Sequence, residues 1–484
     1  MKCIQRIFYT CFMSCLLSIF VICQFTPLPR YYQTSVLDGS KFYVLGGIYR
    51  NNFAYTNEVI YIDLSKKFEI SSPPWNVAVG TPDKEFLATS CLTSVNGSNI
   101  FLIGGLATDL TGLNVIYPSS LVYTFNPNTL QWTTTTTTGF YNTSKTMTRM
   151  QAVIVDNGNI FIFGGFQVDS IVASNRNGNY ANFMNVLNAN TLTWSQPNTI
   201  SNALTPRGGY TANLLNNSFI IYIGGLQFVN GVYSNVDMNE IQIFNTNSLS
   251  WSTMHAYGDV VTARNSHTTV LTNDGHIILF GGNSANDIND NSIISALPDL
   301  AILDTNVSPY KWSAPNITSA YASPSLCYHS ATLYNGIMFI AFGLQTFSRS
   351  PNYYIYIFDV QKYAWVSSSQ PNALSSTTLS TISSTTSPTT SSTTSPATSS
   401  TTSSTNSSMG QGTSGIIISA IVVGGFIFIF IIGGIFYLMK SRNSRDKPIP
   451  TPGTFPDNIH VIPTPGTNAY RFHNDYAQNL RDSK

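Results

Sequence analysis

The sequence predicts an all-β domain of radially stacked repeats, followed by one C-terminal transmembrane helix. Three observations support this prediction. A diglycine that ends a short apolar run recurs at nearly constant spacing, a tryptophan follows every copy, and one long segment near the C-terminus has no charged residue. Only 9% of the 484 residues are charged, against about 25% in an ordinary soluble domain. So few charges argue against coiled coils, helical solenoids and nucleic-acid binders with broad basic faces.

The diglycine ends an apolar run once in each repeat. Its first residue is at positions 46, 104, 164, 224 and 281, so the copies lie 58, 60, 60 and 57 residues apart. A sixth run, AFG, keeps only Gly343. After each copy comes an alternating segment that ends in Asp or Asn, and then a tryptophan. All six tryptophans of the protein occupy this position: Trp75, Trp132, Trp194, Trp251, Trp312 and Trp365.

Each repeat is predicted to contain four strands, designated a to d, because short apolar, β-branched and aromatic runs alternate with Asn, Gly and Asp. Turns such as Asp38-Gly39 and Asn335-Gly336 predict a hairpin between strands a and b. Paired glycines at a strand end permit positive φ and the close approach of a neighbouring chain. One tryptophan per repeat supplies a large buried ring. Such a unit cannot bury its faces alone, but six units stacked radially can.

These residues resemble the kelch repeat, in which a diglycine is followed by a spaced aromatic or aliphatic strand and then by a tryptophan. The resemblance covers residues 24–366 and implies a six-bladed kelch-type β-propeller. The sixth unit has lost one glycine, and units three to five lack the usual tyrosine before their closing Asn or Asp. The arginine expected near the start of the first strand is assigned to Arg30, Arg149, Arg207 and Arg264. We expect these arginines to make hydrogen bonds between blades.

One face of the propeller is predicted to bind a ligand. Because strands a to d alternate in direction, the b–c and d–a connections share a face. The interval from diglycine to closing Asp or Asn varies from 16 to 24 residues, whereas that from tryptophan to the next diglycine varies only from 29 to 32. Variable loops on a rigid scaffold commonly bind partners. We expect this face to recognise an extracellular protein or glycan; loop drift without function is the alternative. The candidate ligand-binding residues are Tyr49, Arg50, Tyr55, Tyr180, Phe228 and Tyr233.

A copper enzyme is an alternative that the resemblance raises. Some kelch-like propellers are copper radical oxidases of the galactose oxidase kind, and Tyr328-His329 resembles their Tyr-His ligand pair. His267 has the same position in unit five, and imidazole suits copper. Those enzymes also need a Cys–Tyr cross-link and a histidine from a later domain, whereas here a Ser/Thr-rich segment follows. We therefore expect a binding module without a cofactor or catalytic residues. The oxidase and a structural surface or cell-wall glycoprotein remain alternatives.

The two ends of the chain predict a single-pass type I protein of the plasma membrane, with its N-terminus outside. Residues 1–23 place Lys2 and Arg6 before a short apolar run, which is typical of a secretory signal peptide; an uncleaved anchor is the alternative. Residues 415–439 lack charge and are long enough to span about 30 Å of hydrocarbon. Four basic residues follow at once, between 440 and 447, which indicates a cytosolic C-terminus.

The remaining segments agree with that topology. Residues 367–414 are rich in Ser and Thr and predict an O-glycosylated stalk. Residues 440–484 predict a disordered cytoplasmic tail, whose repeated IPTPGT sequence could dock a cytosolic adaptor or be passive. Residues 24–439 carry a net charge of −4, so no nucleic-acid partner is expected. Predicted N-glycosylation sites all precede the span: Asn96, Asn142, Asn216, Asn306, Asn316 and Asn406.

Overall fold

The computed structural model describes residues 25–49, 54–93, 98–109, 114–139, 146–172, 175–197, 204–215, 218–287 and 292–369. These residues form β-strands and no α-helix, which confirms the all-β class. They belong to one compact unit, Met1–Ser380. Within the described ranges no helix could span a membrane. The predicted signal peptide (1–23), transmembrane helix (415–439) and tail (440–484) lie outside the described residues, as does the stalk except for 367–369.

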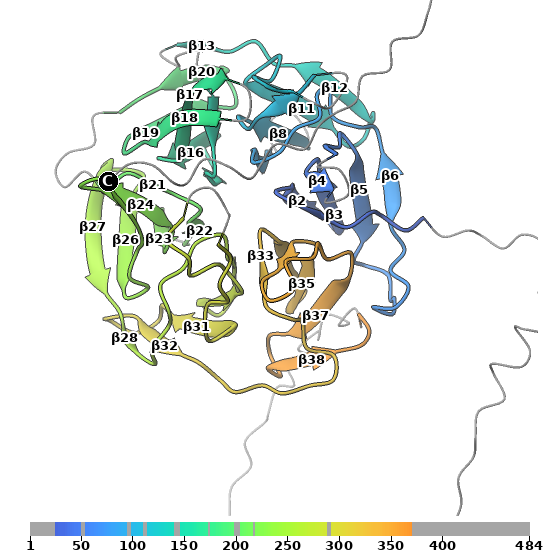
Figure 1. Cartoon of the computed structure of the whole chain (residues 1–484), viewed down its shortest axis with the longest axis vertical. Coiled ribbons are helices and arrows are strands. Elements are labelled where there is room, and N and C mark those ends of the chain that lie inside the picture. Colours follow the sequence, from blue (N-terminus) through green and yellow to red (C-terminus); the bar gives the residue numbers. More distant parts are fainter. Residues whose placement is uncertain are drawn as a thin grey trace, which may run out of the picture. The chain divides into compact units, whose positions relative to one another are not determined.

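Six antiparallel sheets follow one another along the described chain, each built from four strands in the order a to d (Figure 1). Sheet one contains β2 (Thr34–Asp38), β3 (Lys41–Leu45), β5 (Val59–Asp63) and β6 (Asn76–Ala78). Sheet two contains β7 (Thr89–Thr93), β8 (Asn99–Ile103), β11 (Val122–Asn126) and β12 (Gln131–Thr134). Sheet three contains β15 (Ala152–Ile154), β16 (Asn159–Phe163), β19 (Met184–Asn188) and β20 (Thr193–Ser195).

The second half of the domain repeats this arrangement. Sheet four contains β22 (Thr211–Leu214), β23 (Phe219–Ile223), β26 (Glu240–Asn245) and β27 (Ser250–His255). Sheet five contains β29 (Thr268–Leu271), β30 (His276–Phe280), β31 (Leu300–Asp304) and β32 (Lys311–Ser313). Sheet six contains β34 (Ser330–Tyr334), β35 (Ile337–Ala341), β37 (Ile355–Asp359) and β38 (Ala364–Val366). Short strands β13 (Thr138–Gly139) and β28 (Tyr257–Gly258) pair in parallel with the outer strands β20 and β32.

Shorter pairings join the segment before strand a to the segment after the diglycine. They form β1 (Arg30–Tyr31) with β4 (Ile48–Tyr49), β21 (Arg207–Gly208) with β24 (Leu226–Val229) and β25 (Val232–Asn235), and β33 (Leu326–Cys327) with β36 (Leu344–Gln345). Repeat three has β14 (Thr146–Thr148), β17 (Phe166–Val172) and β18 (Asn175–Tyr180). In repeats two and five, single β-bridges join the segment before strand a to the segment after the diglycine. Repeat two also has a short pair of strands, β9 (Ala107–Thr108) and β10 (Val115–Ile116).

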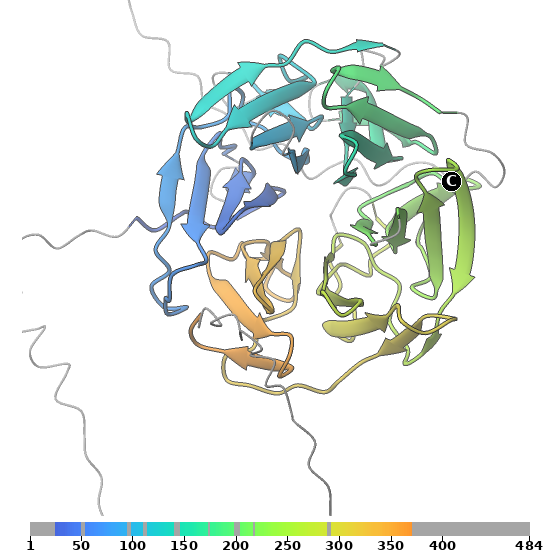
Figure 2. The same ribbon diagram turned by 180° about the vertical axis from the view of Figure 1, so that it is seen from behind.

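The six sheets are arranged around a common centre, as Figures 1 and 2 show from opposite sides. Their inner strands contact one another in the order β2, β7, β15, β22, β29 and β34, and β34 contacts β2. All four strands of each sheet come from one repeat, so sheets six and one meet without exchanging a strand. On the outside, residues 367–369 continue from β38 and bond to repeat one: the Ile70 N–H donates to the Ser367 carbonyl at 2.9 Å.

Hydrophobic cores lie between neighbouring sheets, and each tryptophan is in one of them. Trp75 packs with Phe42 of sheet one and Phe339 of sheet six. The indole N–H groups of Trp132 and Trp312 donate to the carbonyls of Val79 and Met238 in the preceding repeats, both at 3.0 Å. The prediction of buried rings is therefore confirmed for five tryptophans, and Trp132 is half-buried against its cluster.

The second glycine of each repeat bonds to the next repeat. Its N–H donates at 2.8–2.9 Å to the carbonyl of a residue that precedes strand a of the following repeat. The six bonds run from Gly47 to Glu85, Gly105 to Met147, Gly165 to Arg207, Gly225 to Arg264, Gly282 to Leu326, and Gly343 to Arg30. We name the six acceptors the anchor carbonyls. The last bond joins repeat six to repeat one, so the diminished AFG run keeps the glycine that makes this contact.

The arginine prediction needs correction, because these side chains bond mainly within their own repeat. Arg30 pairs with Glu58, and Arg207 Nη2 lies 3.4 Å from Glu240 Oε1. Arg264 Nη1 donates to the Gly281 carbonyl at 2.8 Å. Hydrogen bonds between repeats come from the backbone of these residues instead, because their carbonyls are anchor carbonyls.

Replacing Gly343 by Ala is expected to lower the free energy of unfolding by about 2–5 kcal/mol, from left-handed strain and overpacking together. The new methyl group would lie 2.5 Å from His329 Cβ and 2.8 Å from the Cys327 carbonyl oxygen, at a φ of +86°. Gly39→Ala is the control, since its φ is +58° but nothing lies within 4 Å. It should cost only about 1–2 kcal/mol. Urea unfolding measures the free energy of unfolding of both variants. An equal decrease in Gly343→Ala and Gly39→Ala would contradict this role for Gly343.

A buried glutamate makes stability depend on pH. Glu85 has a carboxyl group with no hydrogen-bond partner among the described residues, and burial, with a smaller effect of Asp83, raises its pKa well above 4.5. The folded domain therefore holds this proton where the unfolded chain has lost it, so the free energy of unfolding falls as pH rises above about 4.5. Glu85→Gln should flatten the decline of Tm between pH 5 and 8, whereas Glu69→Gln, an exposed control, should not. An unchanged slope in Glu85→Gln would contradict the buried acid as its cause.

Candidate functional site

A pocket of about 160 Å³ lies where the six inner strands begin. Each repeat contributes two consecutive residues to its wall. The pairs are Tyr32 and Gln33, Leu87 and Ala88, Arg149 and Met150, Gly209 and Tyr210, Ser266 and His267, and Tyr328 and His329. Because these residues come just before strand a, the pocket opens at the end of the sheets that carries the b–c and d–a connections.

The first residue of each pair adopts a left-handed backbone conformation, with φ between 55° and 68°. This turn directs its N–H toward the preceding repeat. The N–H groups of Leu87, Arg149, Gly209, Ser266 and Tyr328 donate to the carbonyls of Tyr32, Leu87, Arg149, Gly209 and Ser266 at 2.7–3.4 Å. Between repeats six and one a side chain takes over, since Gln33 Nε2 donates to the Tyr328 carbonyl at 3.2 Å. We call the first residues of the six pairs the pocket ring: Tyr32, Leu87, Arg149, Gly209, Ser266 and Tyr328.

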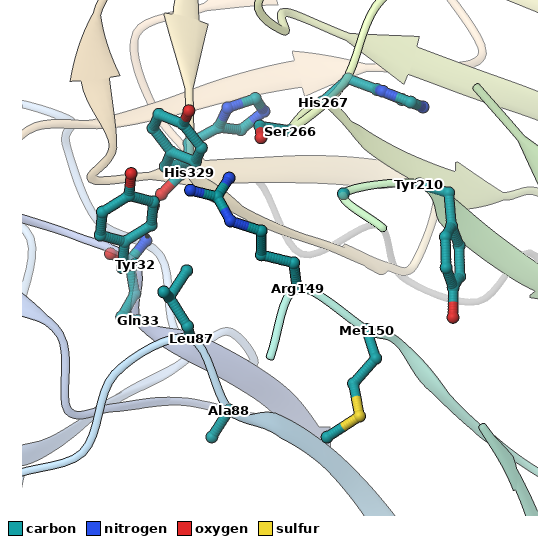
Figure 3. A pocket seen from close by; sticks show the side chains of 12 residues that line it. Tyr32, Gln33, Leu87, Ala88, Arg149, Met150, Tyr210, Ser266, His267 and His329 are labelled. Carbon is teal, nitrogen blue, oxygen red and sulfur yellow. Dashed lines mark hydrogen bonds between the residues drawn. The ribbon is translucent and has the colours of Figure 1, made fainter. Parts of the chain in front are cut away.

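Side chains at the first and the second position of these pairs point in different directions (Figure 3). Tyr32 and Arg149 point toward one another across the pocket, and the Arg149 guanidinium carbon lies 5.8 Å from the centre of the Tyr32 ring. Tyr210 and His267 point away from the middle, between the sheets. The pocket ring therefore determines which chemical groups a ligand would meet, whereas the second positions pack between repeats.

Arg149 does not occupy the position that the sequence analysis assigned to it. Met147 carries the anchor carbonyl of repeat three, and Arg149 belongs to the pocket ring. The spacing to the diglycine contains this signal: Arg30, Arg207 and Arg264 precede their glycines by 16 or 17 residues, but Arg149 by only 15. Two residues are enough to move an arginine from the within-repeat ion pairs into the pocket.

The two histidines pack between repeats. His267 Nε2 lies 3.1 Å from Thr211 Oγ1, and His329 Nε2 lies 2.7 Å from Thr268 Oγ1, each hydroxyl belonging to the preceding inner strand. Burial lowers the pKa of His329 to about 3 and, with Arg264 and His329 nearby, that of His267 well below 6.5. Both rings are therefore neutral at physiological pH.

This donor set does not fit the copper centre that the resemblance implied. The Nε2 atoms of His267 and His329 have threonine partners, whereas their buried Nδ1 atoms have no hydrogen-bond partner among the described residues. Among the described residues no three His, Cys, Asp or Glu side chains come together. Tyr328 lies in the pocket ring with its ring centre 4.4 Å from that of Tyr32, and Cys91 is a buried free thiol in sheet two. We therefore derive no oxidase step.

The candidate aromatic residues gather beside the pocket ring. Tyr180 is buried together with Tyr32 and Tyr328, and Tyr55, Phe228 and Tyr233 pack against that cluster. The ring centres of Phe228 and Tyr233 are 4.5 Å apart, and those of Tyr180 and Tyr233 are 6.3 Å apart. Burial raises the pKa of Tyr180 to about 12, so its phenol stays protonated. Tyr180 is buried, whereas Tyr55, Phe228 and Tyr233 are half-buried.

The other two candidate ligand-binding residues are Tyr49 and Arg50. The Tyr49 hydroxyl lies within the Arg30 ion pair, 3.1 Å from Glu58 Oε2 and 3.0 Å from Thr56 Oγ1. Its half-buried side chain therefore supports the arginine pair. Arg50 lies outside the described residues.

Two of the predicted glycosylation sites are described. Asn306 follows β31 in sheet five, at the end opposite the pocket, and its Nδ2 donates to the Asp274 carbonyl at 2.8 Å and to Asp304 Oδ1 at 3.0 Å. Asn316 is exposed in the connection from sheet five to sheet six. Asn96, Asn142, Asn216 and Asn406 lie outside the described residues.

Comparisons with known proteins agree with this architecture. The model of the KLHDC2/KLHL20/DRC7 Kelch-repeats domain matches residues 32–282 and 228–387. The solved structure of YjhT superposes with a TM-score of 0.50 at 14% identity, over 70% of this chain and 98% of that chain. The likeness to YjhT concerns the fold alone. The chain belongs to the kelch-repeat family.

Curated relatives share only part of their length with this chain. The Rho GTPase-activating protein gacHH of Dictyostelium discoideum is 27% identical over 169 residues, which are 35% of this chain and 10% of that protein. Acyl-CoA-binding domain-containing protein 4 of Arabidopsis thaliana is 22% identical over 56% of this chain and 37% of its own. Acyl-CoA-binding domain-containing protein 5 of the same plant is 22% identical over 66% and 44%. This chain thus spans less than half of each relative.

If the chain is secreted, Asn316 is expected to carry a glycan and Asn306 to remain bare. A glycan on Asn306 would replace one of the two N–H groups that hold its turn, whereas the exposed Asn316 loses no such bond. Peptide mass spectrometry after enzymatic deglycosylation in heavy-oxygen water measures occupancy of both sites, with Asn316→Gln as the control. Full occupancy of Asn306 would contradict this expectation.

Proposed function

We propose that residues 24–366 form a closed six-bladed propeller and that the protein is a binding module, recognising a protein or glycan through its b–c and d–a loop face. The circle of hydrogen bonds from the second glycines to the anchor carbonyls supports closure, because its sixth member joins Gly343 to Arg30. A rigid ring with variable loops is a scaffold suited to binding. The central pocket is then the place where part of the ligand inserts.

The observation that carries this proposal is the composition of the pocket ring. Tyr32, Leu87 and Tyr328 give it an apolar and aromatic side, and Arg149 is the one charged residue among those that line it. A cavity of about 150 Å³ can hold a benzene-sized group, so the 160 Å³ pocket suits one side chain or one sugar ring. Guanidinium and tyrosine together favour a group that offers hydrogen-bond acceptors beside a flat apolar face.

We further propose the location inferred from sequence: a single-pass type I plasma-membrane protein with an external propeller, a glycosylated stalk and a tail that contacts a cytosolic adaptor. Its support is the sequence of the two chain ends, which carry a basic and apolar N-terminal segment and an uncharged segment followed by basic residues.

Arg149→Met in the full-length protein should weaken binding at least about tenfold, because arginines near the centre of an interface are frequent hot spots. The probes are a glycan array and a library of secreted ectodomains. Lys66→Met is the control, since it removes a cation from an exposed side chain that is absent from the pocket wall. Equal signals from the two variants would contradict the pocket as the binding site. No binding by the wild type would favour the structural-glycoprotein alternative.

A further inference from the structure

Four large apolar side chains are exposed to water on the loops of repeats five and six, on the same face as the pocket. They are Val260, Ile294, Leu297 and Phe347, with exposed fractions of 86%, 56%, 61% and 99%. We call these four residues the rim patch. Single exposed apolar residues are ordinary, but a contiguous group marks an interaction site.

Hydrogen bonds between the loops bring the four residues into one area. The Thr262 N–H donates to the Leu297 carbonyl at 2.9 Å, which joins the loop of Val260 to that of Leu297. The hydroxyls of Ser295 and Thr346 lie 2.6 Å apart and join the loop of Ile294 to that of Phe347. The rim patch therefore combines three chain segments that are distant in sequence.

The loops that carry the rim patch are held by hydrogen bonds. Phe347 is at the tip of a turn in which Gln345 N–H donates to the Ser350 carbonyl at 2.9 Å, and Thr346 N–H donates to the Ser325 carbonyl at 3.0 Å. Ile294 N–H donates to Asn283 Oδ1 at 3.0 Å. Because the backbone of this turn is already held, binding would have to order only the exposed Phe347 side chain, which suits an anchor of an interface.

Charge decides which kind of partner fits. Residues 292–298, 314–325 and 342–348 contain no Asp, Glu, Lys or Arg, and the charged residues that flank the patch in sequence are Asp259, Asp299 and Arg349. An anionic membrane attracts clusters of basic residues, which are missing here. Glycans need several polar side chains around an aromatic ring, whereas three of the four patch residues are aliphatic. An uncharged apolar surface complements a protein.

We propose that the rim patch docks a protein partner that presents a cluster of aliphatic and aromatic side chains, with Phe347 inserting into that cluster. This inference rests on the proposed binding function of the loop face and names the partner class for its rim. The pocket would then receive one group of the same partner or ligand, and the rim patch would supply apolar contact area beside it.

The test is selection of random phage-displayed peptides on the purified full-length protein. We expect enriched peptides rich in Leu, Ile, Phe and Trp, whose affinity falls at least tenfold with Phe347→Ser and with Leu297→Ser. Val77→Ser is the matched control, because Val77 is similarly exposed on the outer strand β6. It should leave affinity unchanged. Both patch variants alter exposed side chains, and circular dichroism verifies that they remain folded.

Several outcomes would overturn the rim patch as a protein-docking site. One is a set of enriched peptides that bind Phe347→Ser as well as the wild type, or no enrichment at all. Another is binding to phosphatidylcholine–phosphatidylserine vesicles that Phe347→Ser abolishes, which would indicate a membrane contact. A third is a dimer in sedimentation that the same variant dissociates. Probes that depend on Arg149 but not on Phe347 would overturn this inference alone and leave the proposed binding function intact.

Discussion

The backbone hydrogen bond from the second glycine of one repeat to the anchor carbonyl of the next is the interaction on which the structure depends. It recurs six times at 2.8–2.9 Å and links repeat six to repeat one through Gly343 and Arg30. In repeat three a side chain on the first glycine would obstruct this approach, because a methyl group on Gly164 would lie 2.7 Å from the Arg207 carbonyl oxygen. Repeat six makes the same bond with Phe342 at this position, and the Phe342 ring lies 5.3 Å from the Arg30 guanidinium carbon.

The same closure determines the pocket. Two residues after each anchor carbonyl, the chain turns through a left-handed conformation, and in repeats two to six the N–H of that residue reaches the preceding repeat. This turn directs pocket-ring side chains such as Tyr32 and Arg149 to the centre. The backbone hydrogen bonds do not depend on which side chain is present, so the ring tolerates Tyr, Leu, Arg, Gly and Ser at equivalent positions. The scaffold is therefore constant while the chemistry of the pocket is free to vary.

Burial keeps three titratable groups of the interior neutral: His267, His329 and Glu85. His267 and His329 lose their protons because solvation of a cation is unavailable between repeats, and Glu85 keeps its proton for the corresponding reason. In contrast, Arg149 lies at the pocket, and the rim patch is apolar and exposed. The interior thus holds the sheets together, and recognition is left to the pocket ring and the loops around it.

Local sequence patterns determined the strands, the hairpins and the positions of the six tryptophans, because side-chain alternation, Asn-Gly turns and the spacing of apolar runs are properties of short segments. They also predicted a binding face and candidate aromatic residues, of which Tyr55, Tyr180, Phe228 and Tyr233 gather beside the pocket ring. Only the tertiary structure assigned Arg149 to the pocket ring, put His329 between two inner strands, and joined Ser295 to Thr346 beside Phe347. Each of these depends on contacts between segments about 50–60 residues apart, and the contact of Gln33 with Tyr328 spans 295 residues. A two-residue shift in register changes the spacing from arginine to diglycine only from 17 to 15 residues, and the fold shows that this shift decides whether the arginine bonds within its repeat or lines the pocket.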